Sequence, residues 1–217
     1  WSLAAELLAT MMIVVLMVYY REKKLVVTRK GTVYRSCLGL SLATFLLNVV
    51  CVYTIEHTEQ VPRAVNLILN SAYFLATVLT CSVIVLYLCY LILEHVYDKR
   101  HLRWASLCIS GATLGYLLLV LWNLSSGVLF SFDPAGNYRR GPLNRIGYAL
   151  MAAELLLLAV CYVQNRASVN RPMVKLMHML PPLAIFLTAF QLAYPQILLN
   201  GMMMAMADLI LFISFQS

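Results

Sequence analysis

Residues 65–93 read VNLILNSAYFLATVLTCSVIVLYLCYLIL, a stretch without one charged side chain. A helix needs about 20 mostly apolar residues to cross the hydrocarbon layer of a bilayer. Residues 65–93 therefore predict a transmembrane helix with length to spare. A helix of this length either tilts in the bilayer or continues into the cytoplasm.

The same criterion finds further apolar runs along the whole chain. The chain of 217 residues is 62% hydrophobic and only 12% charged, whereas a soluble domain carries about 25% charged residues. We therefore expect an all-α integral membrane protein, a single seven-helix transmembrane bundle over residues 1–217. The predicted helices are 2–20, 37–55, 65–93, 105–124, 146–163, 176–193 and 197–215, and only Tyr194, Pro195 and Gln196 separate the last two as a tight turn.

The positions of the basic residues predict the orientation of these helices. Cytoplasmic loops carry an excess of Lys and Arg, and 12 of the 16 such residues fall on one side of the predicted membrane. The N-terminus is therefore expected outside and the C-terminus inside. The net charge of +7 then serves orientation and contact with anionic lipid, and nucleic acid is not expected as a partner. The 12 are Arg21, Lys23, Lys24, Arg29, Lys30, Arg35, Lys99, Arg100, Arg103, Arg166, Arg171 and Lys175; the other four are Arg63, Arg139, Arg140 and Arg145.

Three acidic residues, Glu6, Glu154 and Asp208, fall within the predicted spans. A carboxylate is costly inside a membrane, so each is a candidate functional group. In one interpretation, Glu154 and Asp208 hydrogen-bond to neighbouring polar side chains and hold helices together. In the other, they face a polar pocket and bind a ligand. A proton or ion path is a third reading, although no basic residue lies deep enough to pair with them.

Other polar side chains gather towards the outer ends of the predicted helices. Asn66, Asn70 and Tyr73 are spaced to share one face of a helix. These side chains either form the aromatic and polar belt common at membrane interfaces or line a pocket that opens outwards. We favour the belt for Trp122 and the pocket for Asn70 and Asn200. The remaining candidates in this group are Asn123, Tyr148 and Gln191.

The longest outer loop, residues 130–143, reads FSFDPAGNYRRGPL. Phe130 and Phe132 alternate with a serine, and residues 133–136 have the composition of a type I turn. The segment therefore predicts a short extracellular β-hairpin between the fourth and fifth helices. Arg139 and Arg140 either supply cations to a ligand or pair with Asp133, Glu56 or Glu59, and Tyr138 lies beside them.

No catalytic or metal-binding motif is present in the sequence. It contains no GxSxG, HExxH or phosphate-binding loop, and its four histidines lack ligand spacing. The six cysteines fall in or beside apolar runs and are expected as buried thiols. Asn123-Leu124-Ser125 matches a glycosylation sequon at the membrane edge. Pro181 and Pro182 interrupt the sixth run and predict a kink that either permits motion or shapes the bundle.

The seven-helix plan, the loop F-x-F-D-x-x-G-x-Y-x-R-G-P-L and the ending Phe215-Gln216-Ser217 resemble a known group of proteins. They are similar to the seven-helix N-terminal sensor domains of bacterial membrane signalling proteins, chiefly GGDEF-type diguanylate cyclases and some histidine kinases. The resemblance implies a homodimer in the bacterial cytoplasmic membrane. It also implies an output domain after Ser217, where c-di-GMP synthesis would take place. No cofactor is expected in this chain.

The function expected from these features is that of a sensor or receptor in signal transduction. An outside or membrane-borne small molecule binds beneath the hairpin, and the last helix passes the change to the output domain. The candidate ligand-binding residues are Asn70, Tyr73, Tyr138, Arg139, Arg140, Tyr148, Glu154, Gln191, Asn200 and Asp208, with Pro181 and Pro182 as a hinge. The alternatives are a small-molecule transporter, a membrane enzyme, and an anchor or assembly partner.

Overall fold

The computed structural model describes residues 4–22, 29–94, 100–134, 136–194 and 200–216. This part of the chain is almost wholly helical, with one short pair of strands. The elements, in order, are α1 (Ala4–Glu22), α2 (Arg29–Glu56), α3 (Arg63–Leu93), α4 (Arg100–Ser126), β1 (Phe130–Phe132), β2 (Tyr138–Arg140), α5 (Ile146–Asn165), a 3-10 turn (Arg166–Ser168), α6 (Arg171–Ala193) and α7 (Asn200–Gln216).

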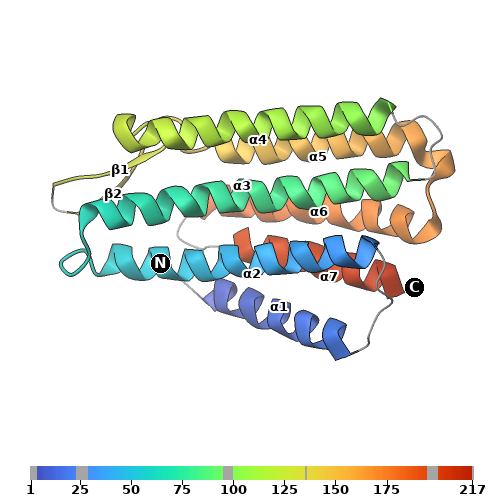
Figure 1. The fold of residues 1–217 in the computed structure, drawn as a ribbon, viewed down its shortest axis with the longest axis horizontal. Helices are drawn as coiled ribbons and strands as arrows, with labels where there is room; N and C mark the ends of the chain where they lie inside the picture. Colours follow the sequence, from blue (N-terminus) through green and yellow to red (C-terminus); the bar gives the residue numbers. More distant parts are fainter. Residues whose placement is uncertain (1–3, 23–28, 95–99, 135, 195–199, 217) are drawn as a thin grey trace.

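The helix α3 forms the centre of the bundle and packs against α2, α4 and α5. The helix α7 packs against α1, α2 and α6. Successive helices run in alternating directions along the bundle. The β1–β2 hairpin and the C-terminal end of α7 therefore lie at opposite ends of the molecule (Figure 1).

The outward faces of these helices are apolar, as in a multi-pass membrane protein. On α4, the side chains of Leu107, Leu114, Leu118 and Leu121 are all exposed and share one helix face. Within the described residues, four helical stretches are long and apolar enough to cross a bilayer, and three shorter stretches are also apolar. The four are Gly31–Glu56, Arg63–Leu93, Arg100–Ser126 and Ile146–Ser168; the three are Glu6–Tyr20, Met173–Leu187 and Gly201–Phe212.

The helix boundaries predicted from apolar runs are wrong at several ends. The helix α2 begins at Arg29, not at residue 37, and α4 and α6 each begin five residues before the predicted position. The basic residues assigned to loops there, such as Arg103 and Lys175, instead belong to helices. Lys and Arg are good helix formers, so a helix continues through them, whereas an apolar run marks only the part within the hydrocarbon.

Two predictions concern the region of α6 and α7, and neither is tested by the described residues. The turn at Pro195 and Gln196 and the predicted start of the last helix at residue 197 lie outside the described residues. The helix α6 continues without interruption through Pro181 and Pro182. The kink and hinge at these prolines stay predictions.

The hairpin is an antiparallel pair that places Phe130 opposite Arg140 and Phe132 opposite Tyr138. At its tip, the Gly136 N–H donates to the Asp133 carbonyl at 2.9 Å. Gly136 has a φ of +85°, and a Cβ there would lie 2.9 Å from the Thr58 Cβ. Both the backbone conformation and the close approach to Thr58 therefore require glycine.

Two asparagine side chains fasten the hairpin to the helices. Asn123 Oδ1 at the end of α4 accepts the N–H groups of Leu129 at 2.7 Å and Phe130 at 3.2 Å. Asn144 Nδ2, just before α5, donates to the Leu129 carbonyl at 2.9 Å and to the Tyr138 hydroxyl at 3.2 Å. Because Asn123 is only 1% exposed, the folded structure has no room for a glycan on this side chain.

The inner face of the hairpin packs into the end of the bundle as a small aromatic core. Phe130 and Phe132 are fully buried, and the Phe130 ring lies 5.0 Å from that of Phe74 on α3. Phe130 also stacks on Tyr138 at 5.7 Å. Aromatic burial of this kind holds the hairpin against α3 and α4.

Candidate ligand cavity beneath the hairpin

A cavity of about 130 Å³ lies beneath the hairpin, between α2, α3, α4 and α5. We call it the hairpin cavity. Its wall is partly apolar, with Val52, Phe74 and Met151 among the residues. Its polar lining comes from every element around it: Asn48, Asn70, Tyr73, Thr77, Tyr116, Tyr138, Arg140, Asn144 and Tyr148.

The hairpin cavity gathers half of the residues predicted as ligand-binding. Asn70, Tyr73, Tyr138, Arg140 and Tyr148 all line it. Arg139, Glu154 and Asp208 do not line it. The side chains of Gln191 and Asn200 lie outside the described part of the structure.

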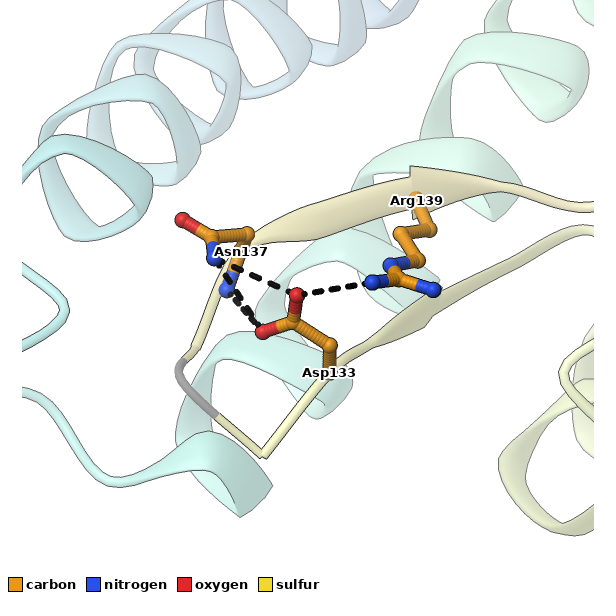
Figure 2. A network of polar contacts seen from close by, with 3 residues as sticks. All are labelled: Asp133, Asn137 and Arg139. Atoms are coloured by element: carbon orange, nitrogen blue, oxygen red, sulfur yellow. Dashed lines mark hydrogen bonds and ion pairs between the residues drawn. The ribbon is translucent and has the colours of Figure 1, made fainter.

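Neighbouring arginines of β2 have different surroundings. Arg139 Nη2 lies 3.3 Å from Asp133 Oδ2, and Asp133 also accepts hydrogen bonds from the Asn137 backbone and side chain (Figure 2). Arg139 thus belongs to the tip of the hairpin, where its predicted pairing with Asp133 is confirmed. Arg140 lines the hairpin cavity, and no carboxylate among the described residues pairs with it.

The polar groups of the hairpin cavity include several donors and no carboxylate. Asn48 is buried, and its Nδ2 has no hydrogen-bond partner among the described residues. The Tyr138 hydroxyl accepts from Asn144, which leaves its own proton free to donate. Burial raises the pKa of Tyr138 to about 12, although Asn144 and Arg140 oppose the rise. Tyr138 is therefore a protonated donor at neutral pH, and together these groups suit a ligand that accepts hydrogen bonds.

Several residues of the hairpin cavity escaped the sequence analysis, notably Asn48, Tyr116 and Asn144. Asn48 stands within the apolar run 37–55. Its signal is a polar stripe on α2, because Ser41, Thr44 and Asn48 are spaced to share one helix face. No comparable pattern marks Asn144, which lies in the connection between the hairpin and α5.

The carboxyl group of Glu154 links α5 to α3. Ser82 Oγ donates to Glu154 Oε1 at 2.6 Å, and Thr113 Oγ1 of α4 lies 2.9 Å from Ser82 Oγ. Glu154 is buried, and its Oε2 has no partner among the described residues. These contacts match the interpretation in which Glu154 holds helices together.

The other two buried carboxyl groups both involve α7. Glu6 Oε1 of α1 accepts the Gly201 N–H at 3.1 Å, in the first turn of α7, where the helix dipole favours an anion. Asp208 is fully buried on α7. Ser41 of α2 lies close to its carboxyl group but outside hydrogen-bonding distance, and Tyr34 donates to its backbone carbonyl at 2.8 Å.

Two substitutions of Glu154 distinguish a role as hydrogen-bond acceptor between helices from a role that requires its negative charge. We expect Glu154→Gln to keep the Ser82 hydrogen bond and leave stability within about 0.5 kcal/mol of the parent. Glu154→Leu removes the acceptor and should cost about 1 kcal/mol, the usual scale for such bonds in membranes. Unfolding in detergent measures both. If Glu154→Gln is as damaging as Glu154→Leu, the charge itself is required and the linking role is wrong.

The described residues contain no group of three or more His, Cys, Asp or Glu side chains that could hold a metal ion. The lining of the hairpin cavity combines an arginine, amides, phenols and the thiol of Cys51. Comparisons of the chain with protein-family models, with curated proteins and with solved structures found no match.

Proposed function

We propose that this chain is a membrane sensor domain. A small ligand binds in the hairpin cavity, and α7 carries the resulting change to a cytoplasmic output domain. The observation that supports this most strongly is the hairpin cavity itself, where polar side chains from α2, α3, α4, α5 and the hairpin converge. Convergent polar groups in a largely apolar pocket are typical of ligand sites.

The orientation in this proposal follows from the basic residues. Arg103, Arg171 and Lys175 belong to the end of the bundle away from the hairpin, near the C-terminal end of α7 (Figure 1). The excess of basic residues at that end favours its placement in the cytoplasm. In this arrangement all seven helices cross the membrane, and the N-terminus and the hairpin are outside.

The route from the hairpin cavity to α7 is short. Asn48 lines the hairpin cavity and lies close to Glu6, and Glu6 in turn binds the first turn of α7. A ligand that interacts with Asn48 changes the surroundings of Glu6, and therefore the packing of α1 on α7. For this change to carry a signal, the ligand must bind one packing more tightly than the other.

The output in this proposal follows the resemblance of the sequence to bacterial sensor domains. We expect a GGDEF diguanylate cyclase or a histidine kinase to follow Ser217, in a homodimer in the bacterial cytoplasmic membrane. The nucleotide sequence downstream of Ser217 tests this part directly. A stop codon close after Ser217 would contradict it and would favour the transporter or assembly-partner alternatives.

A blocked cavity tests the binding part of the proposal. Val52 is 5% exposed and lines the hairpin cavity, whereas Val50 on the same helix is 44% exposed. We expect Val52→Phe to fill the cavity and abolish any rise in thermal midpoint that a panel of fatty acids, amino acids, amines and indoles produces. Val50→Phe adds the same bulk outside the cavity and should respond as the parent does.

The thermal midpoint is measured on the purified chain in nanodiscs, with each compound in turn. A compound that stabilises the parent and Val52→Phe equally binds elsewhere, and such a result for every active compound would overturn the hairpin cavity as the site. The absence of any stabilising compound would also count against a sensor role.

A further inference from the structure

A second and larger cavity lies between α3, α5, α6 and α7, with a volume of about 510 Å³, and it opens on the outer face of the bundle, where Leu156 and Ile185 of its lining are exposed. We call it the apolar cavity. Its lining is almost entirely hydrocarbon, with Leu88, Leu155, Ala159, Leu180 and Ala184 among the residues. An apolar cavity of about 150 Å³ already holds benzene, so this cavity has room for a much longer hydrocarbon.

Two residues of α5 form the boundary between the hairpin cavity and the apolar cavity. Tyr148 and Met151 line both cavities, and they lie one helical turn apart on the same face of α5. The thioether side chain of methionine is flexible and fits ligands of irregular shape. A ligand that occupies both cavities requires these two side chains to move apart.

The chemistry of the two cavities differs in a way that specifies the ends of such a ligand. Beneath the hairpin, the exposed Arg140 has no carboxylate partner among the described residues. The buried Asn48 Nδ2 lies close to the Glu6 carboxyl group but outside hydrogen-bonding distance of it. The hairpin cavity is small and contains no acidic side chain. These features fit a compact anionic head group. The apolar cavity offers the surroundings of a hydrocarbon chain.

We propose that the ligand is a long-chain fatty acid, with its carboxylate at Arg140 beneath the hairpin and its chain in the apolar cavity. The carboxylate accepts hydrogen bonds from Arg140 and from the Asn48 amide. The chain runs past Tyr148 and Met151 towards the middle of the bundle. This assignment rests on the proposed function and names the ligand class for the same site.

The test is binding of tritiated palmitate to the purified chain in phosphatidylcholine nanodiscs, with empty nanodiscs subtracted. We expect saturable binding of one palmitate per chain. Arg140→Gln should weaken it about ten- to hundredfold, because a charge-assisted hydrogen bond is lost. Its matched control is Arg139→Gln, since Arg139 pairs with Asp133 and does not line the cavity; this variant should bind as the parent does.

A second pair of variants tests the position of the chain. Ala159 lines the apolar cavity, whereas the neighbouring Val160 is exposed on α5. Ala159→Phe should weaken palmitate binding about tenfold, and Val160→Phe should leave it unchanged. Butyrate, which has the head group without the chain, and 1-hexadecanol, which has the chain without the charge, should each fail to displace palmitate at equal concentration.

Several results would overturn the assignment. Equal binding to Arg140→Gln and the parent would show that the head group is not beneath the hairpin. Displacement by butyrate would show that the long chain is not needed for binding. Displacement by 1-hexadecanol would show that the charge is not needed. Tighter binding of hexadecyl phosphate than of palmitate would show that the site prefers a phosphate head group to a carboxylate. In each of these cases the sensor role survives if another compound stabilises the parent but not Val52→Phe.

Discussion

Gly201→Val is expected to lower the stability of the protein by about 3 kcal/mol or more, through separation of α1 from α7. A Cβ at Gly201 would collide with the carboxyl group of Glu6. Glu6 is fully buried and accepts the Gly201 N–H, so its side chain has little room to move aside. The substituted side chain therefore displaces α1.

The measurement is chemical or thermal unfolding of the purified protein in detergent. Gly111→Val on α4 is the matched control, because a Cβ there meets nothing within 4 Å. We expect this control to unfold close to the parent. Equal midpoints for Gly201→Val and Gly111→Val would show that α1 and α7 do not pack through this contact.

The second large effect is expected from Asn123→Leu, which removes the acceptor for two hairpin N–H groups. Each buried N–H left without a partner costs about 1–3 kcal/mol, so the backbone of Leu129 and Phe130 should leave its place at the end of the bundle. The hairpin then detaches from α4, and the hairpin cavity loses its cover.

Limited trypsin digestion reports this detachment, because Arg139 and Arg140 lie in β2. We expect rapid cleavage after these residues in Asn123→Leu and slow cleavage in the parent. Ser125→Ala is the control, since its exposed hydroxyl donates to the Trp122 carbonyl within α4. Unchanged cleavage of Asn123→Leu would contradict the anchoring role of Asn123.

The helical segments of this fold could be predicted from the sequence because the bilayer imposes a length of about 20 apolar residues. The ends of the helices could not be predicted in the same way. Arg103 and Lys175 lie beyond the apolar runs but within helices, because a helix can extend past the edge of the hydrocarbon layer. An apolar run marks only the part of the helix within the hydrocarbon layer.

The hairpin segment was predictable for a different reason. The alternation of Phe130 and Phe132 and the turn composition before Gly136 are local signals, and the structure has an antiparallel strand pair in this segment. The side of the membrane on which it lies remains a prediction. The hydrogen bonds from the hairpin backbone to Asn123 could not be predicted from any local sequence pattern.

The composition of the hairpin cavity was predictable only in part. Asn70 and Tyr73 were found because their spacing places them on one helix face at the end of an apolar run. Asn48 and Asn144 come from other elements, and which helix faces meet depends on tertiary packing. For the same reason, the sequence could not distinguish Glu154, which bonds to Ser82, from a residue of the hairpin cavity.

Hydrogen–deuterium exchange of α7 is the most direct test of the claim that a ligand beneath the hairpin acts on the last helix. The chain in nanodiscs is compared with and without palmitate, or with and without another compound that stabilises the parent but not Val52→Phe. We expect the ligand to slow exchange in residues 130–140 and to change exchange in α7, with neither effect in Val52→Phe. Slower exchange in the hairpin with no change in α7 would contradict the sensor role, because a ligand would then bind without reaching the output end of the bundle.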